Sequence, residues 1–240
     1  IDRDEEALDI CKQNLKTSSS ILSLYHNSYN NLDKILAAEG LSAFNGVLLD
    51  LGLSSLQLGS KNRGFSYRSE SPLDMRYDQS SGSGAGKLIN QTDQGSLAQI
   101  FKEYGEERLA SRIAKSIKEM TIMNTIADLR EAIRRCTPPN HRDRTFARIF
   151  QALRIAVNQE LGILEQFLTK FIDFLRPGGR IVIISYHSLE DRLVKHSFKK
   201  LASGGTLDIL TKRPITATEK ERKKNRRARS AKLRAAVKVT

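Results

Sequence analysis

Apolar residues follow two different patterns in the first and last parts of this chain. Residues 21–25, 47–49 and 181–184 form largely apolar runs, which are typical of strands buried on both faces of a parallel sheet. Residues 4–15, 30–38 and 189–201 instead carry apolar side chains at helical spacing, and Asp4 stands where a helix N-cap is expected. Strands that alternate with helices in this way predict a doubly wound α/β domain.

The middle of the chain has a different pattern. Residues 53–78 are rich in Ser, Gly and Arg and have few periodic apolar positions, so they predict a long loop, and such loops usually carry function. Residues 79–86 are of low complexity, and residues 97–135 show only helical periodicity, with a break at 121–125. We therefore predict a first part of the α/β domain at 1–78, a helical insertion at 79–144, and a second part of the α/β domain at 145–240.

After the predicted insertion the α/β pattern returns. Residues 145–174 have helical periodicity, residues 176–180 form a Pro-Gly-Gly turn, and the apolar run at 181–184 follows. Residues 206–210 and 232–239 alternate apolar and polar positions, which predicts half-buried strands and an antiparallel end to the sheet. The turn and this ending favour a class I methyltransferase sheet. A nicotinamide-dependent dehydrogenase, whose sheet would be expected to continue with parallel strands, is disfavoured.

Charge adds a second expectation. The 240 residues contain 40 Lys and Arg against 27 Asp and Glu, a formal net charge of +13. Such an excess favours a polyanionic partner, although a merely basic surface would give the same number. Most of the local excess lies between residues 212 and 238. No apolar run approaches the roughly 20 residues of a membrane span. Cys11 and Cys136 have no metal-ligand spacing, so we expect reduced thiols and no metal site.

Asp2 and Asp50 each follow apolar residues at the end of a predicted strand. Ligands of open α/β sheets bind beyond the carboxyl ends of the strands, where a carboxylate can bind ribose hydroxyls or an amino group. Gly52 permits close backbone approach there. His187, after the run at 181–184, could steer a substrate base or take part in proton removal. Strand-end acids, an ordinary turn and a structural histidine are the alternative interpretations.

A series of short motifs runs along the chain in order. It consists of residues 1–4, Gly46-Val47-Leu48-Leu49-Asp50-Leu51-Gly52-Leu53-Ser54-Ser55-Leu56-Gln57-Leu58, residues 63–66, 72–76, 104–108, 144–146 and 151–158, Ser185-Tyr186-His187-Ser188-Leu189-Glu190-Asp191-Arg192, and residues 225–234. Together these motifs resemble the RsmH (MraW) family of ribosomal RNA cytosine-N4 methyltransferases. The match covers essentially the whole chain, which makes it far more specific than any single motif.

The resemblance implies a Rossmann-like class I methyltransferase sheet with a helical insertion that recognises RNA. It implies methyl transfer from S-adenosylmethionine to the exocyclic N4 of a cytidine in the decoding region of small-subunit (16S) ribosomal RNA. By motif matching, Asp2 binds the cofactor ribose, Tyr29 lies beside the adenine, and Asp50 and Gln57 make further cofactor contacts. Tyr29 replaces the family's more usual Phe and Leu56 its more usual Pro, and the family's Gly-rich cofactor loop lies just upstream of the first residue.

The implied chemistry assigns roles to further residues. Cytosine N4 is a poor nucleophile because its lone pair is delocalised, so the protein must chiefly position it. A carboxylate that accepts an N4 hydrogen would raise its nucleophilicity, and Asp50 is the candidate for this catalytic role, which competes with a cofactor contact. Phosphate contacts are expected from a set of basic residues, with a solvated surface as the alternative: Arg63, Arg68, Arg76, Arg226, Arg227 and Arg229.

The partner expected from the resemblance is small-subunit ribosomal RNA or the 30S subunit, without a membrane, and a homodimer is left open. The expected compartment is the bacterial cytoplasm, with an organellar relative as the alternative. Two rival functions also stay open on the same fold. One is an amino-methyltransferase that acts on DNA or another nucleic acid, and the other is a non-catalytic RNA-binding relative.

Overall fold

The chain forms two compact units in the computed structural model, which describes residues 1–15 and 22–239. The sheet unit comprises Ile1–Asp2, Ser23–Gly52 and Leu161–Thr240, and the helical unit comprises Arg3–Leu22 and Leu53–Glu160. These borders differ from those predicted at 78/79 and 144/145. The second predicted border falls inside helix α8 (Arg142–Asn158), which packs as one piece on α5 (Gln94–Gly105). The loop at 53–78 joins the helical unit because Phe65, Leu73 and Met75 are buried in that unit's core.

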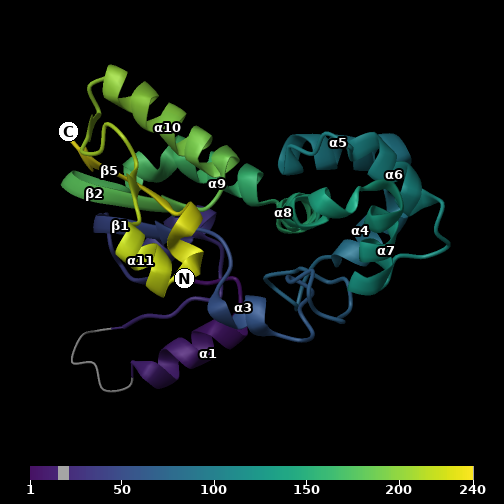
Figure 1. Ribbon diagram of the computed structural model, residues 1–240. Helices are drawn as coiled ribbons and strands as arrows, with labels where there is room; N and C mark the ends of the chain where they lie inside the picture. Colours follow the sequence, from purple (N-terminus) through teal and green to yellow (C-terminus); the bar gives the residue numbers. More distant parts are fainter. Residues whose placement is uncertain (16–21, 240) are drawn as a thin grey trace. The chain divides into compact units, whose positions relative to one another are not determined.

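The sheet unit contains a mixed sheet. Its strands are β1 (Phe44–Asp50), β2 (Leu175–Ser185), β3 (Leu207–Ile209), β4 (Ile215–Thr216) and β5 (Lys232–Lys238). The order is β1-β2-β5-β3, with β4 also paired to β5, and Figure 1 shows β1, β2 and β5 side by side. The β1–β2 pair is parallel and all pairs with β5 are antiparallel. The predicted α/β class and the predicted antiparallel ending are therefore confirmed.

Two details of the sheet differ from the sequence prediction. Leu49 is 8% exposed but Leu48 is 66% exposed, so the prediction of burial on both faces is wrong for β1. Within residues 1–15 and 22–239, β1 pairs with β2 only, and its outer face has no covering layer over Leu48. The predicted Pro-Gly-Gly turn lies inside β2 as a bulge, because the pairing shifts from Phe44–Leu175 to Gly46–Arg180. Gly178 has φ +76°, which only glycine adopts at low cost.

Helices cover the sheet and form its core. The sheet unit contains η1 (Tyr29–Asn31), α2 (Leu32–Ala38), η3 (Phe171–Phe174), α10 (Ser188–Ser203), α11 (Glu219–Lys224), η4 (Arg226–Ser230) and nearly all of α9 (Glu160–Lys170). Phe167, Phe171 and Phe198 from the helices pack in one cluster with Ile181 and Ile183 of β2. Most of these elements follow the predicted periodicity. Residue 21 lies outside the described residues, and residues 22–25 form no strand; a single parallel bridge joins Asp2 and His26 instead.

The helical unit has its own core. It contains α1 (Glu5–Asn14), α3 (Ser55–Gly59), α4 (Ala85–Gln91), α5, α6 (Ala110–Lys118), α7 (Ile126–Cys136), η2 (Pro139–His141) and α8. The predicted break at 121–125 separates α6 from α7, and Thr125 and Asp128 form a capping box that begins α7. Helix α3 was not expected in the predicted loop. No described helix combines the length and apolar character that crossing a membrane requires.

Candidate functional site

Asp50 is the last residue of β1, at the carboxyl end of the parallel strand pair. Its Cα pairs with that of Ile184 in β2, and the backbone N–H of Leu51 continues the ladder to the carbonyl of Ile184. The side chain of Asp50 is exposed, although β2 lies directly beside it. The strand therefore ends by presenting a carboxylate at the edge where ligands of α/β sheets bind.

Tyr186 holds this carboxylate from the neighbouring strand. Its hydroxyl donates a hydrogen bond of 2.9 Å to Oδ1 of Asp50. Burial, and then the hydrogen bond to Asp50, raise the pKa of Tyr186 to about 12, so the phenol stays protonated at neutral pH. The Tyr186 ring lies over Gly52, where an added Cβ would come within 3.1 Å of ring carbon Cδ2. Gly52 has φ +99°, so both its conformation and this close approach favour glycine.

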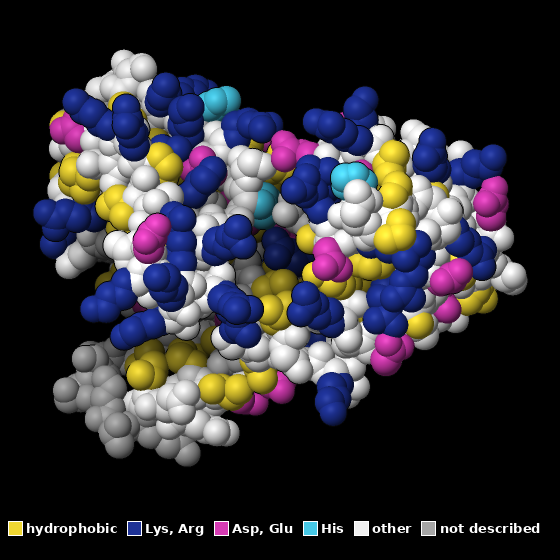
Figure 2. Space-filling view, viewed as in Figure 1, with side chains coloured by type: hydrophobic (Ala, Val, Ile, Leu, Met, Phe, Trp, Pro, Cys, Tyr) yellow, Lys and Arg dark blue, Asp and Glu magenta, His cyan; other side chains and the backbone are white. Residues whose placement is uncertain are grey.

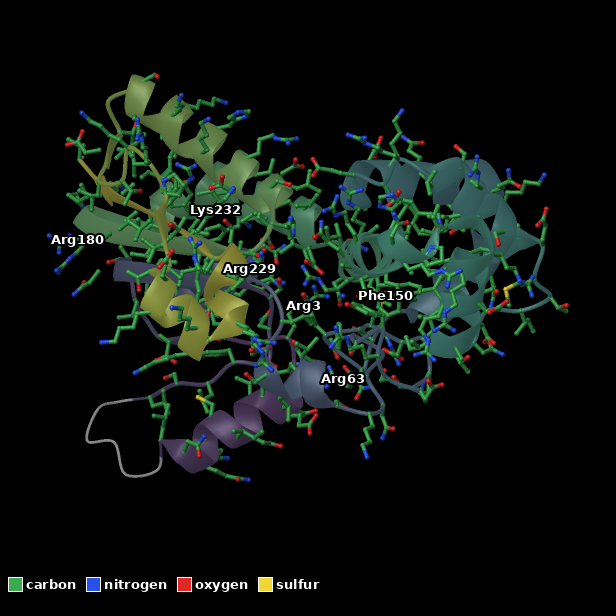
Figure 3. The ribbon with its side chains drawn as sticks, in the orientation of Figure 1. Arg3, Arg63, Phe150, Arg180, Arg229 and Lys232 are labelled. Carbon is green, nitrogen blue, oxygen red and sulfur yellow. The ribbon has the colours of Figure 1, made fainter. Side chains whose placement is uncertain are left out.

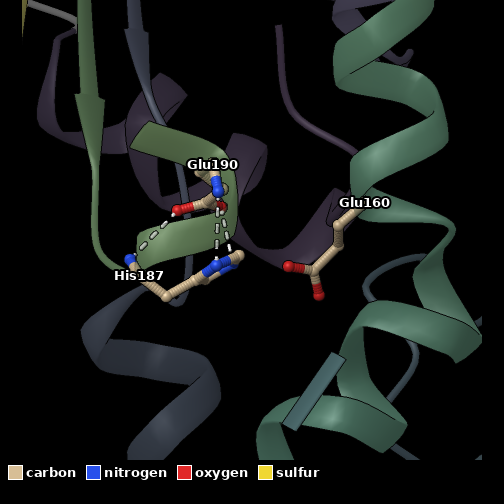
Figure 4. Close-up of side chains that lie close together, drawn as sticks. All are labelled: Glu160, His187 and Glu190. Carbon is tan, nitrogen blue, oxygen red and sulfur yellow. Dashed lines mark hydrogen bonds and ion pairs between the residues drawn. The ribbon is translucent and has the colours of Figure 1, made fainter. Parts of the chain in front are cut away.

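His187 and Glu190 form the start of α10, directly after Tyr186. Nδ1 of His187 accepts the N–H of Glu190 at 3.4 Å, and the Glu190 carboxylate accepts the N–H of His187 at 3.4 Å (Figure 4). The same carboxylate accepts the N–H of Tyr186 at 2.9 Å. This is a capping box in which a histidine side chain takes the place of Ser or Thr. The His187 side chain is 7% exposed. Its contacts are those of a structural cap, and the catalytic role predicted for it stays a prediction.

Asp2 and Tyr29 belong to the same unit as Asp50. The backbone N–H of Asp2 donates to the Tyr25 carbonyl at 3.1 Å, and the Asp2 carbonyl accepts the N–H of Asn27 at 3.0 Å. Tyr29 is half-buried, and its ring meets that of Phe167 edge to face at 5.5 Å between centroids. Backbone hydrogen bonds thus fix Asp2, and the ring of Tyr29 packs against the core. Their predicted contacts with ribose and adenine stay predictions.

Gln57 lies in a buried polar network of the helical unit. Its Oε1 accepts the N–H of Ser54 at 3.1 Å, and its Nε2 donates to Oδ2 of Asp4 at 2.8 Å. The same Asp4 oxygen lies 2.8 Å from Nη2 of Arg63, whose label in Figure 3 stands beside α3. Asp4 occupies the N-cap position of α1, as expected, but its side chain makes no capping bond. Gln57 is 4% exposed, so its predicted cofactor contact would require this network to open.

Two of the predicted phosphate contacts are engaged inside the helical unit. Arg63 is 3% exposed and also donates to the carbonyls of Arg76 and Tyr77. Arg76 binds Asp74 through Nε and Nη2, and its Nη1 donates to the Gln79 carbonyl at 3.0 Å. The hydrogen bond to Asp74 raises the pKa of Arg76. Burial leaves Arg63 no open face for a phosphate, and Arg76 organises the loop that follows it.

The other predicted phosphate contacts are exposed. Arg68 stacks on the Tyr67 ring at 5.6 Å and remains exposed on the helical unit. Arg226, Arg227 and Arg229 are exposed on η4 of the sheet unit, where Lys and Arg side chains also gather over α11 (Figure 2). These four cations are available to a polyanion, which suits the predicted contact with RNA phosphates.

A buried ion pair fixes the end of the basic segment. Asp191 in α10 binds Nε of Arg234 at 2.7 Å and Nζ of Lys232 at 3.2 Å, both from β5. Burial raises the pKa of Asp191, but the hydrogen bonds and charges of Arg234 and Lys232 outweigh burial, so the net pKa is lowered. The pair attaches β5 to the first turn of α10.

Tyr186 and Asp191 are the contacts that the sequence did not assign. Both lie in the motif at 185–192, in which only the histidine was assigned a role from the sequence. The contact between Tyr186 and Asp50 could have been found from the position of Tyr186, two residues beyond Ile184, which is the register partner of Asp50. That register follows from pairing β1 with β2, which the strand patterns alone did not specify.

Comparison with known proteins gives a consistent result along the chain. Residues 1–239 match the model of the MraW methylase family. The chain is 47% identical to "Ribosomal RNA small subunit methyltransferase H" of Kosmotoga olearia, over 100% of the chain and 82% of that protein. A protein of the same name from Crocosphaera subtropica is 45% identical, over 98% of the chain and 73% of its own length. One from Synechocystis sp. is 50% identical, over 83% of the chain and 65% of its own length.

Proposed function

The chain belongs to the MraW methylase family, and we propose that it transfers a methyl group from S-adenosylmethionine to the exocyclic N4 of a cytidine in the decoding region of 16S ribosomal RNA. Membership of the family confirms the predicted Rossmann-like class I methyltransferase fold. The observation that carries the proposal is the exposed Asp50 carboxylate at the end of β1, held by Tyr186 through one oxygen.

The residues of the sheet unit fit the cofactor chemically. S-adenosylmethionine supplies an electrophilic methyl group and offers ribose hydroxyls, an amino group and an adenine ring. Carboxylates such as Asp2 and Asp50 accept hydrogen bonds from hydroxyl and amino groups, and Tyr29 offers an aromatic ring. Gly52 admits the Tyr186 ring, because a Cβ there would come within 3.1 Å of ring carbon Cδ2. Asp2, Tyr29 and Asp50 of the sheet unit would therefore hold the cofactor, and the contact predicted for Gln57 stays a prediction.

Asp50 also suits the second role, that of acceptor for an amino hydrogen of the substrate. Its Oδ1 accepts the Tyr186 hydroxyl, and the described residues supply no hydrogen-bond partner to Oδ2. An N4–H that donates to Oδ2 would be oriented, and electron density would be pushed toward the nitrogen as it attacks the methyl carbon. One proton must leave N4 after transfer, and a carboxylate within reach can accept it.

RNA binding by exposed cations follows from the same proposal. Arg68 on the helical unit and Arg226, Arg227 and Arg229 on the sheet unit would bind phosphates and fix the register of the RNA. The target base would leave its stack to reach a carboxylate at a strand end, as nucleobase-modifying enzymes require.

A methyl-transfer assay tests the proposed function. The protein expressed from its complete reading frame is incubated with methyl-tritiated S-adenosylmethionine and either 30S subunits, free 16S RNA or duplex DNA. Tritium in the RNA, recovered as N4-methylcytidine after nuclease digestion and mapped to the decoding region, is the expected result. Label in DNA would support the DNA amino-methyltransferase. RNA binding without incorporation into any substrate would support the non-catalytic relative.

A further inference from the structure

Tyr186 contacts the proposed acceptor carboxylate of Asp50, and no role in the reaction has been assigned to it. It follows β2 directly, two residues beyond the register partner of Asp50, and its side chain reaches across to β1. Its hydroxyl is the one described hydrogen-bond partner of the Asp50 carboxylate. Because the Tyr186 hydroxyl donates its hydrogen bond to Asp50, it constrains the orientation of this exposed carboxylate.

The position of Tyr186 is itself fixed from two sides. Its backbone N–H donates to Oε2 of Glu190 at 2.9 Å, and Glu190 is 3% exposed within the first turn of α10. Its ring is held against the backbone of Gly52, the second residue after Asp50. The backbone of Tyr186 is therefore bound to α10 and its ring packs against the loop after β1, which limits rotation of the side chain.

We infer that Tyr186 is a positioning residue for Asp50: its phenol fixes Oδ1 and thereby presents Oδ2 to the amino hydrogen of the nucleobase. The inference rests on the proposed function and adds the residue that sets the geometry of the acceptor. Without the phenol, Asp50 can rotate about its side-chain torsions and be hydrated at both oxygens, and the productive orientation becomes one of several. Since burial raises the pKa of Tyr186 to about 12, the phenol keeps the proton that it donates to Asp50 at neutral pH.

The variant that isolates this contact is Tyr186→Phe, which keeps the ring over Gly52 and the backbone bond to Glu190. We expect kcat to fall about tenfold, the loss typical of one hydrogen bond to a charged group. The midpoint of thermal unfolding should stay at the parent value, and the KM for S-adenosylmethionine should change less than kcat, because Asp2 and Tyr29 would still hold the cofactor. The matched control is Tyr25→Phe, which removes another phenol–carboxylate hydrogen bond of the sheet unit, between Tyr25 and Glu39, and should leave kcat unchanged.

A double-mutant cycle separates positioning from a merely structural role. If Tyr186 acts through Asp50, then Tyr186→Phe should change the residual single-turnover rate of Asp50→Asn by less than about twofold. An equal loss in both backgrounds would overturn the inference, as would a parent rate in Tyr186→Phe alone. Methylation of 16S RNA by the parent protein is the internal reference. Its absence would refute the proposed function and the inference together, whereas its presence with an unaffected Tyr186→Phe variant refutes the inference alone.

Discussion

Two aspartates of this protein, Asp50 and Asp4, have opposite surroundings. Asp50 of the sheet unit is exposed, and a neutral phenol holds one of its oxygens. Asp4 of the helical unit is 3% exposed, and one oxygen lies 2.8 Å from both Arg63 and Gln57. The charge of Asp4 is compensated by Arg63, so Asp4 is not available to a ligand. The Asp50 carboxylate is exposed and oriented, so a ligand can bind to it. We therefore expect Asp50 to act in function and Asp4 to act in stability.

The largest effect should come from the exposed carboxylate. Asp50→Asn keeps the shape of the side chain but removes its charge and its capacity to accept a proton, so methyl transfer should fall about 10³-fold. The assay is incorporation of labelled methyl groups into 30S subunits, with circular dichroism to verify the fold. Asp208→Asn, which changes an exposed aspartate in β3, is the matched control and should retain parent activity. An active Asp50→Asn variant would remove Asp50 from the site.

The buried carboxylate should show the reverse behaviour. Asp4→Ala removes the buried counter-charge of Arg63 and leaves only the exposed Glu6 carboxylate, at 3.4 Å from Nη1, so the free energy of unfolding should fall by about 3 kcal/mol. Urea titration of Asp4→Ala and Asp50→Asn measures the free energy of unfolding of each. Asp50→Asn should unfold at the parent midpoint, and a stable Asp4→Ala protein would mean that the network contributes little to folding.

A third effect concerns the pair that joins α10 to β5. The free energy of unfolding should fall by about 2 kcal/mol in Asp191→Asn, because the charged hydrogen bonds to Arg234 and Lys232 weaken. The net pKa of Asp191 is lowered in the folded state, so its contribution is present above the unfolded pKa and is lost as pH falls through the folded pKa. Thermal melts between pH 7 and pH 3 should therefore show a smaller acid-induced loss in the variant than in the parent. Equal losses would rule out this pair as a source of acid sensitivity.

The smallest effect should come from the exposed cations of η4. Replacing Arg226, Arg227 and Arg229 together by Ala should weaken RNA binding about tenfold and lower the slope of log K against log salt by about 2. Fluorescence anisotropy at several salt concentrations measures both quantities. The control variant replaces Lys199 and Lys200, two exposed cations of α10, by Ala. It tests whether RNA binding depends on the η4 arginines or on any exposed positive charge. An unchanged slope in the triple variant would exclude these arginines from phosphate contact.

The sequence was most informative where periodicity and turn chemistry act locally. The strands at β1 and β2, the helix α10 after them and the break between α6 and α7 follow from apolar spacing, and the antiparallel ending follows from alternation. The domain borders did not follow, because continuity of α8 and burial of Phe65 and Met75 are tertiary facts. Helix α3 was missed because its five residues are too few to show helical periodicity in the sequence.

The sequence likewise identified part of the candidate site and missed the contacts between distant segments. Asp50 was identified from its place after an apolar run, and this place is the end of β1. The difference between Arg63 and Arg229 was not visible, since both are arginines in basic, motif-bearing segments. What separates them is a buried partner, Asp4, which lies 59 residues earlier than Arg63 in the chain. The contact from Tyr186 required the register between β1 and β2, which sequence spacing does not encode.

The most direct test of the account is a crystal structure of the protein expressed from its complete reading frame with S-adenosylhomocysteine and a cytidine-containing RNA fragment. We expect Oδ2 of Asp50 to lie within about 2.6–3.2 Å of the cytidine N4, with Oδ1 still bound by the Tyr186 hydroxyl. A complex in which Asp50 contacts neither the nucleobase nor the cofactor would contradict it.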